Sequence, residues 1–276
     1  MSNFSGQLAV ITGAASGIGR ALAHAASSRG MNLLLADRDP RGLDQVVANL
    51  QKTGQQTIGQ VTDVTAEADL HALALTAWKK FGQVNLLFNN AGICPLGTTW
   101  DMKAEDWRSA VNVNVMGVIY GQMAFLPLMM AQAGSARIIN TGSVAGLSSN
   151  PGGVTYAVTK HAVVALSEGL FMDLQAAQSS VAVSVICPGF VNTNLGAVDR
   201  QENTESIPKS VRLGREALQR TLEQGLAADE LAERVFFGID AGQFWIFPQP
   251  EALAGFDLRA SSIQHQTDPS FIPMLQ

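Results

Sequence analysis

Three side chains in the middle of the chain have types and spacing suited to moving a proton. Ser143 follows the strand-like run 136–140, and Tyr156 and Lys160 lie thirteen and seventeen residues after this serine. If a helix begins near Val154, Tyr156 and Lys160 are four residues apart and share one face. A phenol has an ordinary pKa of about 10, so acid–base work at neutral pH needs a nearby positive charge that favours the phenolate. The serine hydroxyl could hold a carbonyl or alcohol oxygen by a hydrogen bond.

A glycine-rich segment near the N-terminus could hold a phosphate group. The run 8–12 leads into Thr12-Gly13-Ala14-Ala15-Ser16-Gly17-Ile18-Gly19, and a helical pattern begins near Arg20. Glycines permit a tight turn and a close approach of ligand to backbone, and the N-terminus of a helix favours a pyrophosphate. The spacing TGxxxGxG departs from the commoner GxGxxG, and the alternative is a strand-to-helix turn without a ligand. The position of this glycine-rich segment in the first strand–helix unit favours binding of a dinucleotide.

Charged residues after the second and third strand-like runs bear on which dinucleotide binds. Asp37 lies where a residue that reads the ribose belongs, and its carboxylate can accept hydrogen bonds from ribose hydroxyls and repel a 2′-phosphate. Arg38 could pair with that phosphate if Asp37 swung away. Because Asp37 carries the nearer charge, we expect NAD, with NADP as the alternative. Asp63 could accept a hydrogen bond from the adenine amino group, or it could cap the next helix.

Short apolar runs, most of them separated by helical stretches, must position these side chains. The pattern is typical of a parallel sheet covered by helices on both faces. The runs are 8–12, 32–36, 56–62, 84–88, 136–140, 181–186 and 244–247. No linker or internal repeat divides the chain, so we expect a single domain over residues 1–276. We also expect a helical flap at about 196–224 that closes over the substrate, and an irregular tail at 249–276.

Composition and charge argue against several classes of protein. The chain has 276 residues, of which 47% are hydrophobic, and this suits a globular protein with a large core. With 18 basic and 23 acidic residues the net charge is −5, and no basic cluster stands out, so we expect no nucleic-acid partner. Two cysteines and the lack of a secretory signal favour a reducing, cytoplasmic location. The histidines lack ligand spacing, so we expect no metal site.

Residues 109–136 carry no charge and are long enough to cross a bilayer. The stretch is interrupted by Asn112, Asn114, Gln122, Pro127 and Gln132. Each amide would need a hydrogen-bond partner in hydrocarbon. We therefore expect no membrane span, but a helix buried against its own sheet or against another subunit.

Taken together, the motifs are similar to those of a known family. They are Thr12-Gly13-x3-Gly17-x-Gly19, Asn89-Asn90-Ala91-Gly92, Asn114, Ser143, Tyr156-x3-Lys160 and Pro188-Gly189 with Thr193. Their order and spacing resemble the short-chain dehydrogenase/reductase family over residues 6 to about 195. The resemblance implies an α/β, doubly wound Rossmann fold with a seven-stranded parallel sheet in the order 3-2-1-4-5-6-7. It also implies a nicotinamide cofactor and a Ser-Tyr-Lys site extended by an asparagine.

The resemblance implies a role for each residue of this site. Tyr156 would donate or accept the proton, and Ser143 would orient the substrate oxygen. Lys160 would lower the pKa of the tyrosine and bind the nicotinamide ribose, and Asn114 would hold a water that relays protons. The residues expected to contact the cofactor are Gly13, Ser16, Gly17, Ile18, Gly19, Asp37, Arg38, Asp63, Val64, Asn90, Ala91, Gly92, Tyr156, Lys160, Pro188, Gly189, Val191 and Thr193.

The expected function is an NAD-dependent oxidoreductase that interconverts a secondary alcohol and a ketone by hydride transfer. The expected pocket borders are Cys94, Leu96, Val144, Leu147, Phe190 and Leu195. Because they are mostly apolar, they favour a small uncharged substrate. Two alternatives stay open: an NADP-dependent carbonyl reductase, and a non-catalytic regulator that binds NAD(P).

Assembly is also implied by the resemblance. The charge-free helix and the helix after Tyr156 are similar to the pair that forms four-helix interfaces in the family, so we expect a homo-oligomer, a tetramer or a dimer. The chain departs from many members of the family at its end, where residues 243–248 and a long tail replace a glycine-rich ending.

Overall fold

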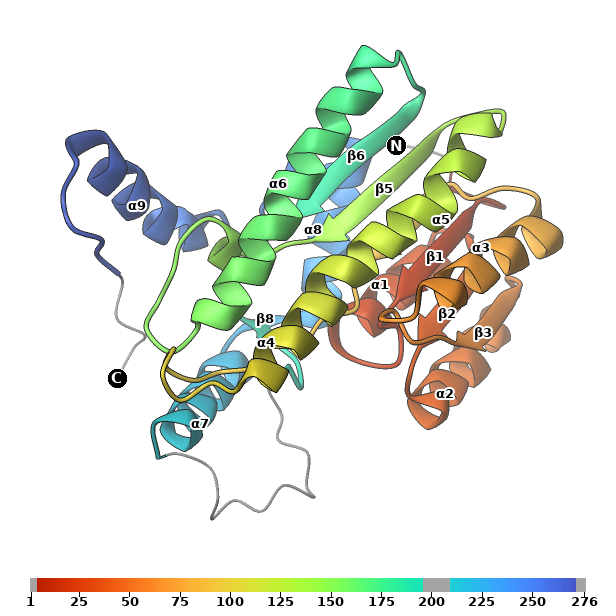
Figure 1. The fold of residues 1–276 in the computed structure, drawn as a ribbon. Coiled ribbons are helices and arrows are strands. Elements are labelled where there is room, and N and C mark those ends of the chain that lie inside the picture. The colour runs from red at the N-terminus through yellow and green to blue at the C-terminus, as the bar shows by residue number, and fades with distance from the viewer. Residues whose placement is uncertain (1–3, 196–208, 272–276) are drawn as a thin grey trace.

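Seven parallel strands form the central sheet of the protein (Figure 1). The computed structural model describes residues 4–195 and 209–271. The strands are β1 (Leu8–Thr12), β2 (Asn32–Asp37), β3 (Thr57–Val61), β4 (Leu86–Asn89), β5 (Ala136–Thr141), β6 (Val181–Ile186) and β9 (Trp245–Ile246). Their order is β3-β2-β1-β4-β5-β6-β9. Since β9 is the seventh strand of this sheet, the expected order is confirmed, and every expected run is a strand whose bounds move by at most two residues.

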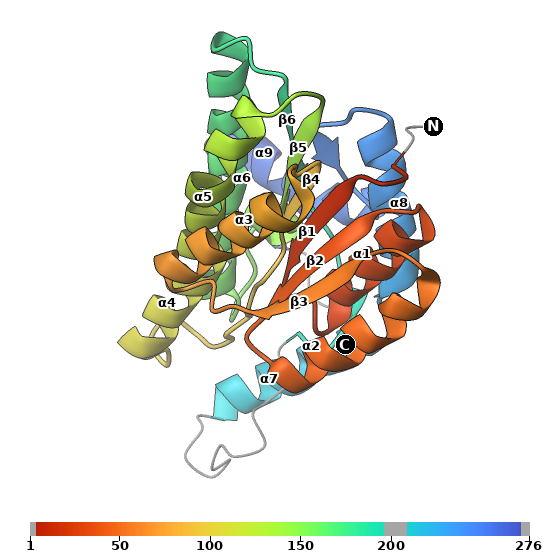
Figure 2. The same cartoon turned by 90° about the vertical axis from the view of Figure 1, so that its right-hand side faces the viewer.

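Helices cover both faces of the sheet (Figure 2). One face carries α1 (Gly17–Ser28), α2 (Pro40–Leu50) and α8 (Ala228–Asp240). The other carries α3 (Glu67–Phe81), α5 (Gly117–Ala131) and α6 (Val154–Ala176). A short helix α4 (Ala104–Val111) leads into α5 through the π-helical turn Asn112–Met116. The architecture is the doubly wound α/β fold that the sequence predicts.

The central strands β1, β2 and β4 are largely apolar because they are buried on both faces. In β1, Ala9 and Ile11 pack in the core under α1, α2 and α8, whereas Leu8 and Val10 pack in the core under α3, α5 and α6. All four side chains are fully buried. Successive side chains of a strand point to opposite faces, so a strand between two helical layers needs apolar residues at every position.

Most of the charge-free stretch lies in the continuous helix Ala104–Ala131, made of α4, the π-helical turn and α5. By length and composition this helix could cross a membrane, but nearly half of its most apolar window is buried inside the protein. It packs against α3 and against β4 and β5. A buried core helix passes the same composition test, and the packing matches the expectation of a helix that belongs to the fold.

The C-terminal third requires one correction. Residues 249–276 are not irregular throughout, because a 3-10 turn, η5 (Pro250–Leu253), leads into the helix α9 (Ala254–His265). Every residue of α9 is at least partly exposed. A helix that buries no face has no apolar stripe, so its period cannot be read from the sequence.

The expected flap is helical in the part that the structure describes. Helix α7 (Lys209–Glu223) covers its second half, and residues 196–208 lie outside the described residues. Two short strands that the sequence did not predict, β7 (Val191–Asn192) and β8 (Leu226–Ala227), flank α7 and pair with each other. They join the two ends of the flap beside the carboxyl ends of the main sheet.

Candidate active site

A cleft of about 610 Å³ opens at the carboxyl ends of the strands. The expected site residues that line it are Gly13, Ser16, Gly17, Ile18, Asp37, Arg38, Asp63, Val64, Asn90, Ala91, Gly92, Ser143, Tyr156, Lys160, Pro188, Gly189, Val191 and Thr193. Gly19 and Asn114 are not among the lining residues and support the walls from behind. Parallel strands end on the same edge of a sheet, and ligands bind where the strand order reverses, here between β1 and β4.

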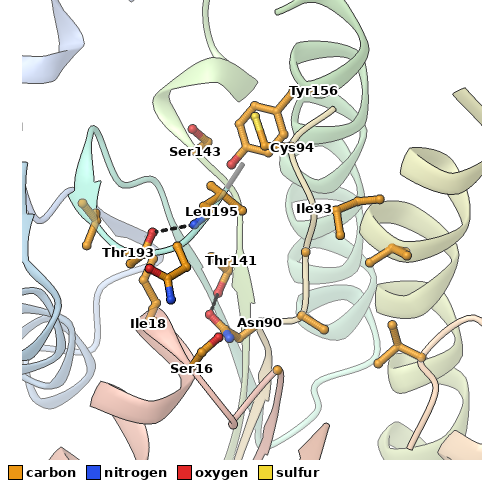
Figure 3. A pocket seen from close by; sticks show the side chains of 18 of the residues that line it. Ser16, Ile18, Asn90, Ile93, Cys94, Thr141, Ser143, Tyr156, Thr193 and Leu195 are labelled. Atoms are coloured by element: carbon orange, nitrogen blue, oxygen red, sulfur yellow. Dashed lines mark hydrogen bonds between the residues drawn. The ribbon is translucent and has the colours of Figure 1, made fainter. Parts of the chain in front are cut away.

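Figure 3 shows the two ends of this cleft. Ser143 and Tyr156 lie close together at one end, with Cys94 beside the tyrosine ring, and Ser16 and Asn90 lie toward the other end. The Ser143 hydroxyl and the phenol lie near each other (Figure 3), and hydrogen bonding by Ser143 lowers the pKa of Tyr156. A single oxygen atom of a ligand could therefore contact both groups.

Local structure around Ser143 explains how it reaches the cleft. It follows β5 and caps the 3-10 turn η3 (Val144–Gly146), where its Oγ accepts a hydrogen bond from the Ala145 N–H at 3.1 Å. Its hydroxyl also donates to the Pro188 carbonyl at 3.4 Å. The serine is therefore held by both the turn after β5 and the loop after β6.

Tyr156 and Lys160 lie on one face of α6, as the spacing predicts, because this helix begins at Val154. The Lys160 Nζ lies 5.5 Å from the centroid of the Tyr156 ring and donates to the Thr141 carbonyl at 2.7 Å. The lysine is only 3% exposed, and burial lowers its pKa to about 8. It stays mostly protonated at neutral pH, next to the phenol.

The pKa of Tyr156 differs from the expectation. Burial raises it well above its ordinary value, the nearby Cys94 raises it further, and the hydrogen bond with Ser143 offsets only part of this rise. The expectation that Lys160 lowers the tyrosine pKa stays a prediction, because the net rise reflects burial of the phenol. The physical reason is that desolvation in the interior penalises the phenolate more than the groups around it stabilise it.

Asn114 braces the site. It is fully buried in the π-helical turn. Its Nδ2 donates to the Ile93 carbonyl and to the Thr159 Oγ1, both at 2.9 Å, and its Oδ1 accepts from the Ile93 N–H at 2.9 Å. Thr159 in turn donates to the Tyr156 carbonyl at 2.8 Å. The side chain thus ties the loop after β4 to α6, and its expected role with a water stays a prediction. Thr159 was not singled out from the sequence, because a threonine inside a helix carries no signal of its own.

The glycine loop has a backbone shape that needs glycine. Gly13 and Gly17 have φ angles of +68° and +51°, a region that favours glycine. A Cβ on Gly13 would lie 2.8 Å from the Ala91 Cα, and one on Gly19 would lie 2.1 Å from the Gly13 carbonyl oxygen. Helix α1 begins at Gly17, and the Ser16 side chain before it makes no capping hydrogen bond. A helix N-terminus without a side-chain cap beside a close-packed glycine turn fits an anionic group such as a pyrophosphate.

Thr12 joins this loop to the segment after β4. Its hydroxyl donates to the Phe88 carbonyl and accepts from the N–H groups of Asn90 and Ala91, at 3.0 and 3.2 Å. The Asn90 Nδ2 donates back to the Thr12 carbonyl at 3.0 Å. These bonds cross the point where the strand order reverses, so they fix the distance between the two sides of the cleft.

We expect Gly19→Ala to weaken dinucleotide binding at least about 100-fold, because the added Cβ would overlap the Gly13 carbonyl and push the loop apart. Calorimetric titration with NAD measures the loss, and thermal unfolding shows that the fold persists. Gly169→Ala is the matched control, since Gly169 lies in α6 with open space around its Cβ position. Equal affinity of the Gly19 variant and the unaltered protein would contradict this account of the loop.

Asp37 is held in place by the glycine loop. Its Oδ2 accepts from the Ala15 N–H and its Oδ1 accepts from the Asp39 N–H, both at 2.9 Å. A swing of Asp37 away from the cleft, which pairing of Arg38 with a 2′-phosphate requires, would break both bonds. Asp63 accepts hydrogen bonds from the N–H and hydroxyl of Thr65, so it caps the turn before α3 and also faces the cleft.

The pocket borders are only partly as expected. Cys94 and Leu195 line the cleft, but Leu96, Val144, Leu147 and Phe190 are not among the lining residues. Further lining residues were not singled out from the sequence; they include Ile93, Pro95, Asp106, Ser109, Val113, Thr141, Arg215 and Leu222. Those from α4 and α7 reach the cleft through tertiary packing. The buried apolar positions 211, 218 and 222 of α7 were the available signal for an inward face.

Within residues 4–195 and 209–271, no three His, Cys, Asp or Glu side chains lie close enough together to hold a metal ion.

Comparison with known proteins agrees with this geometry. Residues 7–204 match the family model of the short chain dehydrogenases. The chain is 32% identical over 259 residues to a CLA biosynthesis dehydrogenase/reductase of Lactiplantibacillus plantarum, covering 91% of each protein. It is 36% identical over 236 residues to Oxidoreductase UcpA of Escherichia coli, covering 84% of this chain and 88% of that protein.

Solved structures extend the similarity to the whole chain. A short chain dehydrogenase/reductase from Burkholderia phymatum, in complex with NAD, has a TM-score of 0.96, 41% identity and full coverage of both chains. Levodione reductase has a TM-score of 0.75 and 28% identity, covering 88% of this chain and 95% of that chain. The family model spans most of the chain and the site has the family's motifs, so this protein belongs to the short-chain dehydrogenase/reductase family of oxidoreductases.

Proposed function

We propose that the protein is an NAD-dependent oxidoreductase that interconverts a secondary alcohol and a ketone. The observation that carries this proposal is the shared cleft: Ser143 and Tyr156 meet at one end, and the glycine loop and Asp37 form the other. The end with the glycine loop suits a dinucleotide as the redox partner, and the end with Ser143 and Tyr156 suits a substrate with one reactive oxygen.

The residues present fit such a cofactor. The N-terminus of α1 and the glycine loop would hold the pyrophosphate, and Asp37 would accept hydrogen bonds from the adenosine ribose. The Lys160 ammonium would bind the other ribose, with Val191 and Thr193 beside the nicotinamide. When bound, NAD supplies the group that accepts the hydride. The preference for NAD is supported by the bonds that keep Asp37 in place and by the NAD complex of the Burkholderia phymatum structure.

Tyr156 would transfer the proton. The substrate oxygen would lie between the Ser143 hydroxyl and the phenol, so that both hydrogen-bond to it. Because burial raises the pKa of Tyr156, the phenol is protonated at neutral pH and ready to donate to a ketone oxygen. In the oxidation direction the phenolate must form, and the Lys160 ammonium is the positive charge that this chain supplies beside it.

The substrate end of the cleft supports a small uncharged substrate. Cys94 lies beside the Tyr156 ring (Figure 3), and Ile93 and Leu195 line the same cleft. Burial raises the pKa of the Cys94 thiol to about 12, so this side chain is neutral as well. Leu222 of α7 closes another part of the wall, which supports α7 as the part of the flap that covers the bound molecules.

The direct test is a screen of uncharged secondary alcohols with NAD, read by the absorbance of the reduced nicotinamide. We expect a series of active alcohols whose rates fall as their size exceeds the cleft. Binding of NAD without turnover of any alcohol or ketone would instead favour the non-catalytic regulator.

Cofactor choice gives a second test. We expect Asp37→Ala to weaken NAD binding about tenfold, because hydrogen bonds to the ribose are lost. The ratio of NAD affinity to NADP affinity should fall as well, because the negative charge that repels a 2′-phosphate is gone. Dissociation constants for both cofactors measure this. Asp44→Ala removes the same charge from an exposed position on α2 and is the control. Tighter binding of NADP than of NAD by the unaltered protein would favour the NADP-dependent carbonyl reductase.

We also infer a homo-oligomer, a tetramer or a dimer, in a reducing cytoplasm. Apolar side chains are exposed on two helices of the same sheet face: Met123 and Met130 on α5, and Val158 and Met172 on α6. Covering them with a second copy would remove apolar surface from water. Both cysteines are free thiols, as a reducing compartment favours. Sedimentation velocity tests the assembly.

A further inference from the structure

Gln249, which follows β9, is bonded to the loop beside the active site. Its Oε1 accepts from the Gly189 N–H at 3.1 Å, and its Nε2 donates to the Phe190 carbonyl at 2.9 Å. One carboxamide thus pairs with an N–H and a C=O of two consecutive residues. Only an amide side chain of this length offers both an acceptor and a donor in this arrangement.

The other side of the same loop is bonded to the catalytic serine. The Pro188 carbonyl accepts from the Ser143 hydroxyl at 3.4 Å and from the Val144 N–H at 3.0 Å. Pro188, Gly189 and Phe190 are consecutive, so this short segment lies between Ser143 and Gln249. If the bonds to Gln249 were lost and the segment shifted, the Pro188 carbonyl that accepts from the Ser143 hydroxyl would move with it.

Packing of the C-terminal segment supports the same arrangement. A Cβ on Gly189 would lie 3.0 Å from the Ala252 Cβ, so η5 presses closely on the loop. A Cβ on Gly255 would lie 2.9 Å from the Ser148 Oγ, which places the start of α9 against the residues that follow η3. Residues 249–255 therefore contact both the loop after β6 and the chain that follows Ser143.

We propose that Gln249 is a positioning residue for hydride transfer. It holds the Gly189–Phe190 peptide against the cleft and, through the Pro188 carbonyl, sets the orientation of the Ser143 hydroxyl. This role rests on the proposed function, and it lies beyond the family match, which ends at residue 204. The C-terminal segment thereby becomes part of the active site's support.

The experiment compares Gln249→Met, which keeps the length and removes both hydrogen bonds, with Gln249→Glu, which keeps only the acceptor for Gly189. Gln264→Met, at an exposed position on α9, is the matched control. The readouts are hydrogen exchange of the Gly189 amide, the NAD dissociation constant by calorimetry, the single-turnover rate of hydride transfer with its deuterium isotope effect, and the melting temperature.

For Gln249→Met we expect at least about tenfold faster exchange at Gly189, about tenfold weaker NAD binding and about tenfold slower hydride transfer. The isotope effect should persist or grow, because the hydride step itself slows. Gln249→Glu should restore protection of the Gly189 amide but not the full rate, since its carboxylate faces the Phe190 carbonyl.

Two results would overturn the proposal. One is faster exchange at Gly189 with both the NAD affinity and the rate of hydride transfer unchanged, which would make the contact structural only. The other is a lower melting temperature with hydride transfer intact. If the unaltered protein binds NAD but oxidises no alcohol, the proposed function fails, whereas exchange at Gly189 and the NAD affinity still show whether Gln249 holds the loop against the cleft.

Discussion

Tyr156→Phe is expected to slow hydride transfer about 10²- to 10⁴-fold while NAD still binds, because the substitution removes only the hydroxyl that we propose as the proton donor. The phenylalanine ring would keep the place of the tyrosine ring beside Cys94 and Lys160. Single-turnover kinetics with an alcohol found in the screen measure the rate, and calorimetry measures NAD affinity. The reverse reaction should slow by the same factor when it is limited by the same step.

The chain provides a matched control for this substitution. Its one other tyrosine, Tyr120, lies in α5, and Tyr120→Phe should leave the rate unchanged. A Tyr156→Phe protein that retains full turnover would contradict the assignment of the phenol as acid and base. If the protein binds NAD and the Tyr156→Phe substitution changes none of its activities, the non-catalytic regulator is the better account.

Lys160→Met is expected to lower the rate of hydride transfer about 100-fold and to change the pH dependence of stability. Burial lowers the pKa of Lys160 from its ordinary value of 10.5 to about 8. Between these two pH values the unfolded chain binds the proton and the folded protein does not. The free energy of unfolding of the unaltered protein therefore rises with pH in this window, relative to the variant, by about 3 kcal/mol in total.

Urea unfolding at intervals from pH 7 to about pH 10 measures this difference. Below pH 8 both folded and unfolded chains hold the proton, so the difference between the two proteins should be constant there. Lys80→Met, at an exposed position on α3, should run parallel to the unaltered protein at every pH. Parallel curves for Lys160→Met would show that burial does not depress the lysine pKa.

The local pattern of the chain was enough to predict the sheet. The strand β1 is apolar at its first four positions because it is buried on both faces, and that need is visible in four consecutive residues. The glycine loop could be predicted for a similar reason, since positive φ angles at Gly13 and Gly17 and the close approach at Gly19 demand residues without a Cβ. Spacing of four residues was enough to place Tyr156 and Lys160 on one face of α6.

Other features depend on contacts between distant parts of the chain. Gln249 reaches Gly189 across sixty residues, and Asn114 meets Thr159 across forty-five. A glutamine or an asparagine in a sequence does not indicate which distant residue it will bond to. Helix α9 was missed because it buries no face. The flap was expected, but Arg215 and Leu222 of α7 were not singled out as lining residues because the neighbours of a helix are set by the fold.

Residue types and spacing by themselves thus determined the positions of the strands, the glycine loop and the helix face that Tyr156 and Lys160 share, because each of these follows from the geometry of one strand, one turn or one helix. The order of the strands was expected from the family resemblance and is confirmed by the fold. Only the tertiary structure decided their electrostatics and support. The pKa of Tyr156 rises and that of Lys160 falls because the folded chain removes both groups from water, and burial is a property of the packed protein as a whole.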